Sequence, residues 1–119
     1  MRYICLVHFD PALLDNLPTP ERQDVDRQTR ALDDELRASG HLVHSEAVQG
    51  GHSAMLVRVR DGKRAVTDGP YMETKEQMAG FVLLEARDLN EAIAIAARDP
   101  LARIGTIEVR PVYDIPIPP

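Results

Sequence analysis

Most of the side chains that could carry out acid–base chemistry lie in one short segment of the chain. Five ionisable residues fall within nine positions, namely Asp68, Tyr71, Glu73, Lys75 and Glu76. A carboxylate can accept and return a proton, and a lysine ammonium can bind an anionic group of a ligand. The segment therefore has two interpretations. It is either a loop that contacts a ligand at the mouth of a cleft, or a structural turn whose charges are solvated.

His8 is the histidine of most interest, because it ends a strand that we expect to lie at the centre of a sheet. The candidate catalytic residues are His8, Asp68, Glu73 and Glu76. The candidate ligand-binding residues are Asp68, Gly69, Pro70, Tyr71, Glu73, Lys75 and Arg110. We expect a cleft bordered by this loop and by the ends of the strands that carry His8 and Arg110. A lone histidine is also typical of a hydrogen-bonded structural residue.

Glu108 and Arg110 are two residues apart in a predicted strand, so their side chains share one face. They would either pair with each other or bind a polar small molecule, because an unpaired buried charge is costly. The four histidines show no spacing typical of a metal site, and the single cysteine, Cys5, can form no internal disulfide. We therefore expect no metal and no cofactor, and we expect Cys5 to be a small buried apolar residue.

The spacing of apolar residues predicts the elements that position these side chains. Strands are expected over residues 2–9, 41–48, 54–60, 63–67, 80–86 and 105–112. Helices are expected over 20–39 and 89–98, the first because Val25, Thr29, Leu32 and Leu36 form one stripe. Residues 10–20 are expected to be a loop, 73–78 a single helical turn and 113–119 an extended tail. Asp61-Gly62 predicts a tight hairpin turn with Gly62 at positive φ.

Two strand–helix–strand halves with an inserted hairpin predict a ferredoxin-like α+β fold with both helices on one face of the sheet. Strands 2–9 and 80–86 are apolar on both faces, and one helix layer covers only one of them. An exposed apolar sheet face is typical of an interface. We therefore expect a homodimer in which two sheets pack face to face and enclose a barrel-like core.

The composition excludes several classes of protein. A chain of 119 residues suits one domain spanning residues 1–119. The net charge of −5 argues against a nucleic-acid partner. No apolar run approaches the roughly 20 residues that span a bilayer, and the N-terminus lacks the pattern of an export leader. We expect a cytoplasmic protein with no membrane partner.

The segment Asp68-Gly69-Pro70-Tyr71-Met72-Glu73-Thr74-Lys75-Glu76-Gln77-Met78-Ala79-Gly80 resembles the signature of the DGPF proteins within the YCII-related group. The resemblance extends over nearly the whole chain, through residues 57–62, 88–92 and 105–112. It implies a dimeric α+β barrel of ferredoxin-like subunits but no known reaction, because the DGPF group is largely uncharacterised. Some members are encoded beside extracytoplasmic-function sigma factors, which suggests regulation.

Related YCII-like proteins include a dehydrochlorinase-type enzyme and proteins with a His/Asp site. Asp99-Pro100 matches the Asp-Pro of those proteins, whereas Thr29 lies near the position of their histidine, so half of the pair is absent.

Three functions remain open from the sequence. The leading hypothesis is a cleft for a small polar or aromatic molecule in a sensor or regulatory accessory protein. One alternative is a cofactor-free lyase or isomerase that uses His8 and the carboxylates of residues 68–76. The other is a protein-interaction module for a transcription regulator. An enzyme should hold a carboxylate or histidine with a raised pKa in a closed cavity.

Overall fold

A four-stranded antiparallel sheet forms the centre of the molecule. The computed structural model describes all residues from 1 to 119. The sheet has the strand order β2-β5-β1-β6. Its strands are β1 (Arg2–Phe9), β2 (Leu42–Ala47), β5 (Gln77–Glu85) and β6 (Gly105–Pro111). The first strand therefore lies inside the sheet, paired with β5 on one side and β6 on the other.

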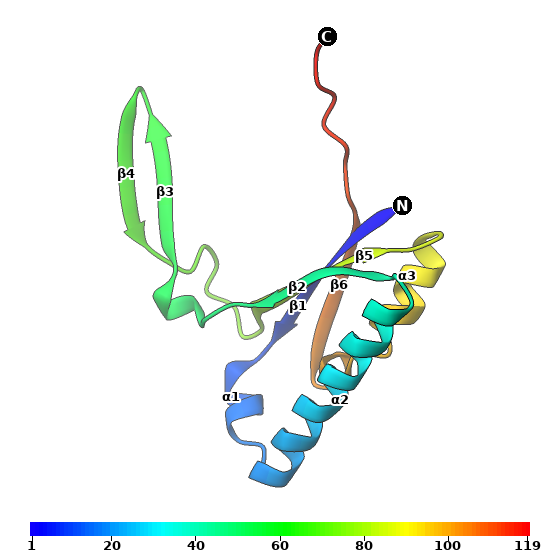
Figure 1. Cartoon of the computed structure of the whole chain (residues 1–119). Coiled ribbons are helices and arrows are strands. Elements are labelled where there is room, and N and C mark those ends of the chain that lie inside the picture. The colour runs from blue at the N-terminus through cyan, green and yellow to red at the C-terminus, as the bar shows by residue number, and fades with distance from the viewer.

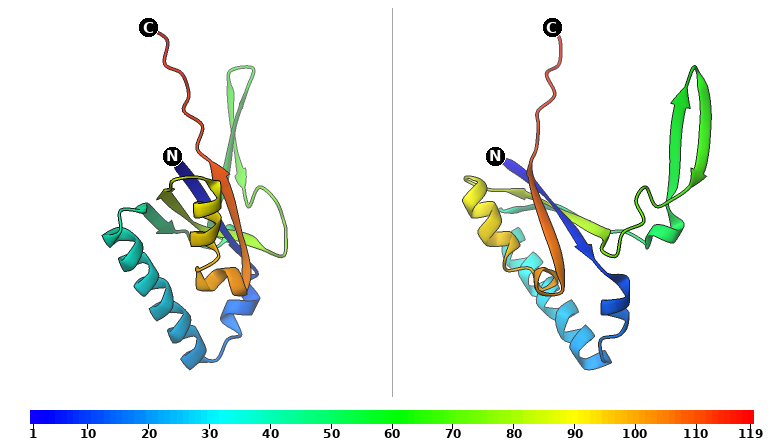
Figure 2. Two further views of the ribbon diagram at one scale, coloured as in Figure 1. Left: turned by 90° about the vertical axis from the view of Figure 1, so that its right-hand side faces the viewer. Right: turned by 180° about the vertical axis from the view of Figure 1, so that it is seen from behind.

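Two helices cover one face of this sheet (Figures 1 and 2). They are α2 (Thr19–Ala38) and α3 (Leu89–Ala96). Asp88 caps α3 because its side chain accepts a hydrogen bond from the Glu91 amide, which otherwise lacks a partner in the first turn. No helix of the chain is long and apolar enough to span a membrane. The strand and helix order confirms the predicted α+β, ferredoxin-like fold.

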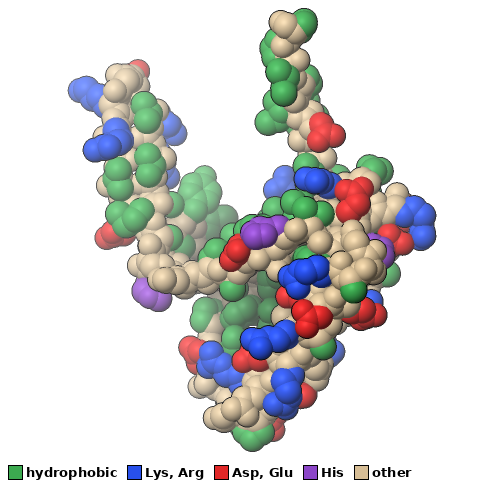
Figure 3. Space-filling model, viewed as in Figure 1, with side chains coloured by type: hydrophobic (Ala, Val, Ile, Leu, Met, Phe, Trp, Pro, Cys, Tyr) green, Lys and Arg blue, Asp and Glu red, His purple; other side chains and the backbone are tan.

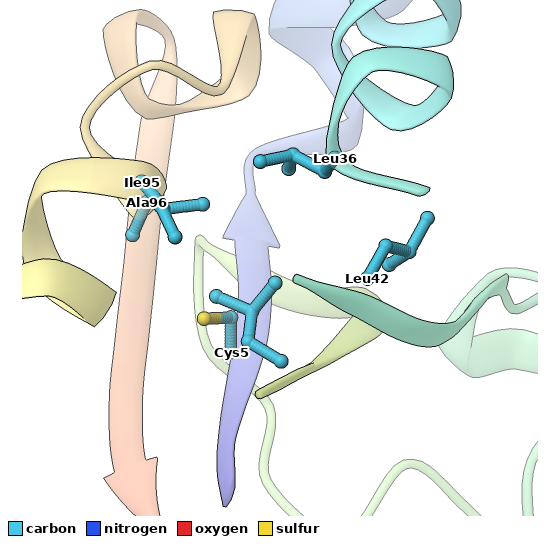
Figure 4. Packing of buried hydrophobic residues seen from close by; sticks show 6 residues of the cluster. Cys5, Leu36, Leu42, Ile95 and Ala96 are labelled. Atoms are coloured by element: carbon cyan, nitrogen blue, oxygen red, sulfur yellow. The ribbon is translucent and has the colours of Figure 1, made fainter. Parts of the chain in front are cut away.

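The main core lies between the sheet and the helices (Figure 4). Its six buried residues are Cys5, Leu36, Leu42, Leu84, Ile95 and Ala96. They come from three strands and both helices, so the core forms only when residues far apart in the sequence meet. A smaller cluster of Tyr3, Ala86 and Ala92 continues it toward the other end of α3.

The inserted hairpin is a separate two-stranded sheet that projects away from the rest of the molecule (Figure 1). It consists of β3 (Met55–Arg60) and β4 (Lys63–Asp68). Asp61 and Gly62 form its turn with φ of 52° and 74°, which confirms the predicted positive φ at Gly62. A glycine is favoured there because side chains rarely adopt this conformation.

Three local expectations were wrong. Residues 10–20 contain a short helix, α1 (Pro11–Asp15), because the Asp10 side chain caps it by accepting from the Ala12 amide at 3.0 Å. Residues 73–78 form no helical turn, and strand β5 begins at Gln77 rather than at 80. The longer strand follows from pairing, since β1 continues past a bulge to place His8 opposite Met78. The remaining elements are the short 3-10 helices η1 (Gly51–Ser53) and η2 (Pro100–Arg103).

The sheet face opposite the helices has no cover within the chain, and we call it the open face. Its centre is apolar, with Ile4 opposite Leu83 and Leu6 opposite Phe81 in the register of β1 and β5. All four are half-buried, and they alternate along their strands with residues of the core on the helix side, such as Cys5 and Leu84. Polar residues of the edge strands, such as Glu108 opposite Leu6, border this apolar centre.

The open face generates a prediction about assembly. We expect the purified chain to have about twice its mass of 13.3 kDa in light scattering, because two open faces would cover each other. Leu6→Glu should give a monomer at micromolar concentration, since it places an unpaired charge in the interface. Ile93→Glu is the control, because this exposed residue lies on α3, on the other side of the sheet. A monomeric wild-type chain would contradict the prediction.

The hairpin turn generates a second prediction. Gly62→Val should destabilise the hairpin by about 1 kcal/mol or more, because a β-branched residue resists positive φ. The hairpin does not pack on the main core, so the loss should appear as faster amide exchange in β3 and β4. Unchanged exchange in both strands would contradict the assigned turn.

Candidate functional site

A cavity of about 410 Å³ lies between α2 and the sheet, and we call it the inner cavity. Its walls are mostly apolar, with Val7 and Phe9 from β1, Val82 from β5 and Val25 from α2 among them. Figure 3 shows hydrophobic side chains in the hollow between the edge of the sheet and the long helix. Such a volume and lining suit a small aromatic or partly apolar molecule.

The polar side of the inner cavity contains two carboxyl groups with raised pKa. Burial raises the pKa of Asp99 above its usual 3.8, against the opposing effects of the Leu101 amide and the Arg103 charge. Burial also raises the pKa of Asp33, and the nearby Asp99 charge adds to that shift. These two aspartates can therefore hold a proton at a pH where an exposed aspartate would be ionised.

Local structure fixes the position of Asp99. Its Oδ1 accepts a hydrogen bond from the Leu101 amide at 2.9 Å, which caps η2 directly after α3. Thr29 and Asp33 lie one helical turn apart on α2, so both face the same cavity. The structure thus brings Asp99 and Thr29, the two positions singled out by the family resemblance, to one site.

Cys5 is buried beside this site but is not among the residues that line it. Burial, together with the Asp99 charge, raises the pKa of its thiol to about 11. The thiol therefore stays protonated at neutral pH, and Cys5 acts as a small core residue as expected.

A second cavity of about 860 Å³, the outer cavity, adjoins the inner one. The two share the lining residues Phe9, Leu14, Val48 and Ala79, and we call the adjoining pair the cleft. The outer cavity is more polar, and four of the predicted site residues line it: Asp68, Gly69, Pro70 and Glu73.

Gly69 anchors this end of the loop by close backbone contact. Its amide donates to the Ala54 carbonyl at 2.8 Å, and a Cβ there would lie 2.7 Å from the Ala54 side chain. Any larger residue would push the loop away from the base of the hairpin. The position of Gly69 in the segment is therefore explained by packing, independent of any ligand.

Other predicted residues line a third hollow of about 630 Å³ at the base of the hairpin, which we call the loop hollow. They are His8, Pro70, Tyr71 and Glu76. The His8 Nε2 lies 3.2 Å from Oε1 of Glu108, and Glu76 accepts from the Thr106 hydroxyl at 2.8 Å. His8 and Glu76 are thus tied to β6 rather than to the inner cavity.

The structure does not gather all predicted residues at one place. Lys75 and Arg110 do not line the inner cavity, the outer cavity or the loop hollow. Arg110 lies opposite Ile4 on β1, four residues from His8, or roughly 13 Å along the strand. The expected pair of Glu108 and Arg110 does not form, because Glu108 pairs with His8 on the neighbouring strand instead. No group of three or more His, Cys, Asp or Glu side chains is placed to hold a metal ion.

Sequence reasoning did not select Asp33 or Ser45, which also line the inner cavity. Asp33 follows Thr29 by four residues, which was a usable signal, because that spacing repeats the apolar stripe of α2. Ser45 gave no signal, since it is one of several polar residues in the strand predicted over residues 41–48.

The fold and the cleft define an α+β protein with a ferredoxin-like sheet and a pocket beneath its helices. The model of the YCII-related domain matches residues 1–116, and the chain belongs to this family. An uncharacterized protein of Rhizobium meliloti, R00369, is 31% identical over 114 residues, which cover 94% of this chain and 92% of that protein.

A solved structure shares the fold. It is the 5-chloro-2-hydroxyhydroquinone dehydrochlorinase of Burkholderia phenoliruptrix in complex with 2,5-dihydroxybenzoquinone. The TM-score is 0.59 at 16% identity, and the match covers 95% of this chain and 94% of that chain. At this identity the likeness concerns the fold.

The raised pKa of Asp99 generates a prediction about pH and stability. A carboxyl whose pKa is higher in the folded state than in the unfolded state stabilises the fold when it is protonated. For Asp99 this stabilisation is lost as the pH rises from the usual 3.8 through the higher pKa of the folded state. Asp99→Asn keeps an oxygen that can accept from the Leu101 amide but removes the charge. The variant should therefore gain stability relative to wild type as pH rises from 4 to 7. Denaturant titrations at pH 4 and pH 7 measure the difference in free energy of unfolding between the variant and wild type. An equal difference at both pH values would contradict the raised pKa of Asp99.

Proposed function

We propose that this chain is a cytoplasmic homodimer that binds a small aromatic or polar molecule in the cleft formed by the inner and outer cavities. The observation that carries the proposal is the inner cavity itself, where an apolar wall meets two aspartates with raised pKa. An aromatic ring would be desolvated by the wall, and a hydroxyl or carbonyl group on the ring would hydrogen-bond to Asp99 or Asp33.

The polar outer cavity supplies the route to this site. Asp68 and Glu73 lie at its rim on the loop, whereas the shared apolar residues lead inward. The loop thus contributes to ligand entry and to the specificity of the mouth, while the aspartates contact the buried part of the ligand.

The raised pKa of Asp99 favours a second function. A carboxyl group that titrates closer to neutral pH can both donate and accept a proton, as a cofactor-free lyase or isomerase requires. This candidate places the acid–base group at Asp99 rather than at His8 or the loop carboxylates. The dehydrochlorinase with the same fold is compatible with such a reaction.

Binding is tested with 2,5-dihydroxybenzoquinone and a panel of simple phenols in thermal-shift assays. A ligand at ten times its Kd stabilises the fold by about 1.4 kcal/mol, which raises the Tm of a domain of this size by several degrees. Thr29→Phe should abolish the shift because the ring fills the inner cavity. Arg30→Phe, at the next and exposed position of α2, should leave the shift intact. Equal loss in both variants, or loss in neither, would contradict the site.

The two functions are separated by a catalytic assay. Chloride release from 5-chloro-2-hydroxyhydroquinone is measured with wild type, Asp99→Asn and Asp34→Asn. For the enzyme, Asp99→Asn should reduce the rate about 100-fold or more, while Asp34→Asn, on the exposed side of α2, should have no effect. Ligand binding with no turnover of any panel member would favour the sensor.

A further inference from the structure

The β3–β4 hairpin has one apolar face that nothing in the chain covers. Four exposed residues share this face: Met55, Val57, Val59 and Val66. Their exposed fractions lie between 49% and 64%. Isolated two-stranded hairpins are only marginally stable in water, and a third strand or a packed layer is usually needed. A further strand or a packed layer from a partner would therefore stabilise the hairpin.

The C-terminal tail has a matching pattern. The Val112 amide still donates to the Arg2 carbonyl at 3.0 Å, and after it the chain runs on as an unpaired segment from Tyr113 to Pro119 (Figure 1). Tyr113, Ile115 and Ile117 alternate along it and are 76%, 78% and 90% exposed. In an extended chain these three side chains lie on one face, as in a strand with one apolar side. Figure 3 shows hydrophobic side chains on both the hairpin and the tail.

The prolines of the tail leave one of its edges able to pair. Only every second residue of an antiparallel strand exchanges hydrogen bonds with a given neighbour. Tyr113, Ile115 and Ile117 all have a backbone N–H for one edge, whereas Pro116 and Pro118 remove donors from the other edge. The tail can thus add to one sheet edge, and further strands cannot readily add beyond it.

The charges of the hairpin favour the same chain as partner. Residues 55–68 hold four basic side chains and two acidic ones, and the remaining residues hold ten basic and seventeen acidic side chains. A basic arm on an otherwise acidic chain is complementary to a second copy. In an added third strand, Asp114 would face the side of the hairpin that carries Arg58 and Arg60, because it alternates with the apolar residues.

The hairpin's simplest partner is not the tail of the same chain, because the hairpin and the tail leave opposite edges of the main sheet. The hairpin follows β2 at one edge of the main sheet, and the tail follows β6 at the other edge. Both project to the side of the open face, away from the helices (Figures 1 and 2). A two-fold axis parallel to the sheet would bring the tail of each copy beside the hairpin of the other, and the contact would then be made twice.

We propose that the tail, residues 113–119, adds as a third strand to the hairpin of a second copy of this chain. The contact places the tail's Tyr113, Ile115 and Ile117 beside the exposed apolar residues of each hairpin, so that one apolar face extends over three paired strands. The loop hollow lies at the base of the hairpin, so the partner's tail also closes the side of the molecule next to the outer cavity. The proposal is independent of what the cleft binds.

Cross-linking between two variants tests the contact. Val57→Cys protein is mixed with Ile115→Cys protein, left to exchange subunits, and treated with a short bismaleimide. The expected result is a product of twice the monomer mass in the mixture and little in either variant alone. Cys5 does not interfere, because it is 2% exposed. Arg58→Cys mixed with Ile115→Cys is the matched control, since Arg58 lies on the opposite face of the hairpin, and it should react much less.

Three outcomes would overturn the proposal. The first is a product in Val57→Cys protein alone, which would mean that two hairpins contact each other. The second is an equal yield of cross-linked product with the Arg58→Cys control. The third is no cross-linked product in the mixture of Val57→Cys and Ile115→Cys. A second measurement uses Ile115→Asp, which should raise the Kd of the dimer about tenfold or more. Ile93→Asp, at an exposed isoleucine on α3, should leave it unchanged. A Kd unaffected by Ile115→Asp would also overturn the proposal.

Discussion

The pairing of β1 with both β5 and β6 is the interaction on which the rest of the structure depends. It places Cys5 and Tyr3 under the helices and Ile4 and Leu6 on the open face, because side chains alternate along the strand. The core and the open face are therefore two consequences of one register. A shift by one residue would exchange the two faces and bury the wrong set.

The cleft results from the way in which the helices pack against this sheet. Helix α2 packs closely at its C-terminal end, where Leu36 is buried, and the inner cavity lies along its middle, between Val25 and Asp33. Asp99 comes to that cavity because η2 turns the chain directly after α3. Its raised pKa results from this placement, since a carboxyl held by the fold at a half-buried position loses hydration.

The sequence predicted the elements well where the apolar pattern was strong, as in the apolar run of strand 2–9 and in the helical stripe of α2. It failed at residues 10–15, where the Asp10 cap begins a short helix, and at residues 73–78, where pairing with β1 starts β5 at Gln77. Of the candidate site, the loop was placed beside a cleft, but its residues are divided between two hollows. Asp33 and Asp99 could not be ranked from sequence, because their acidity depends on burial by segments 60 or more residues apart.

The central place of β1 also determines how the chain can fold during synthesis. Both neighbours of β1 are made late, since β5 begins at Gln77 and β6 ends at Pro111. Pairing over such separations is slow, because a long loop must close before any contact is gained. On the ribosome, β1 therefore waits with both edges unpaired until β5 has emerged, and with one edge unpaired until β6 follows. Through that interval a strand that is apolar on both faces stays exposed with an unpaired edge, and such exposure raises the risk of aggregation in the nascent protein.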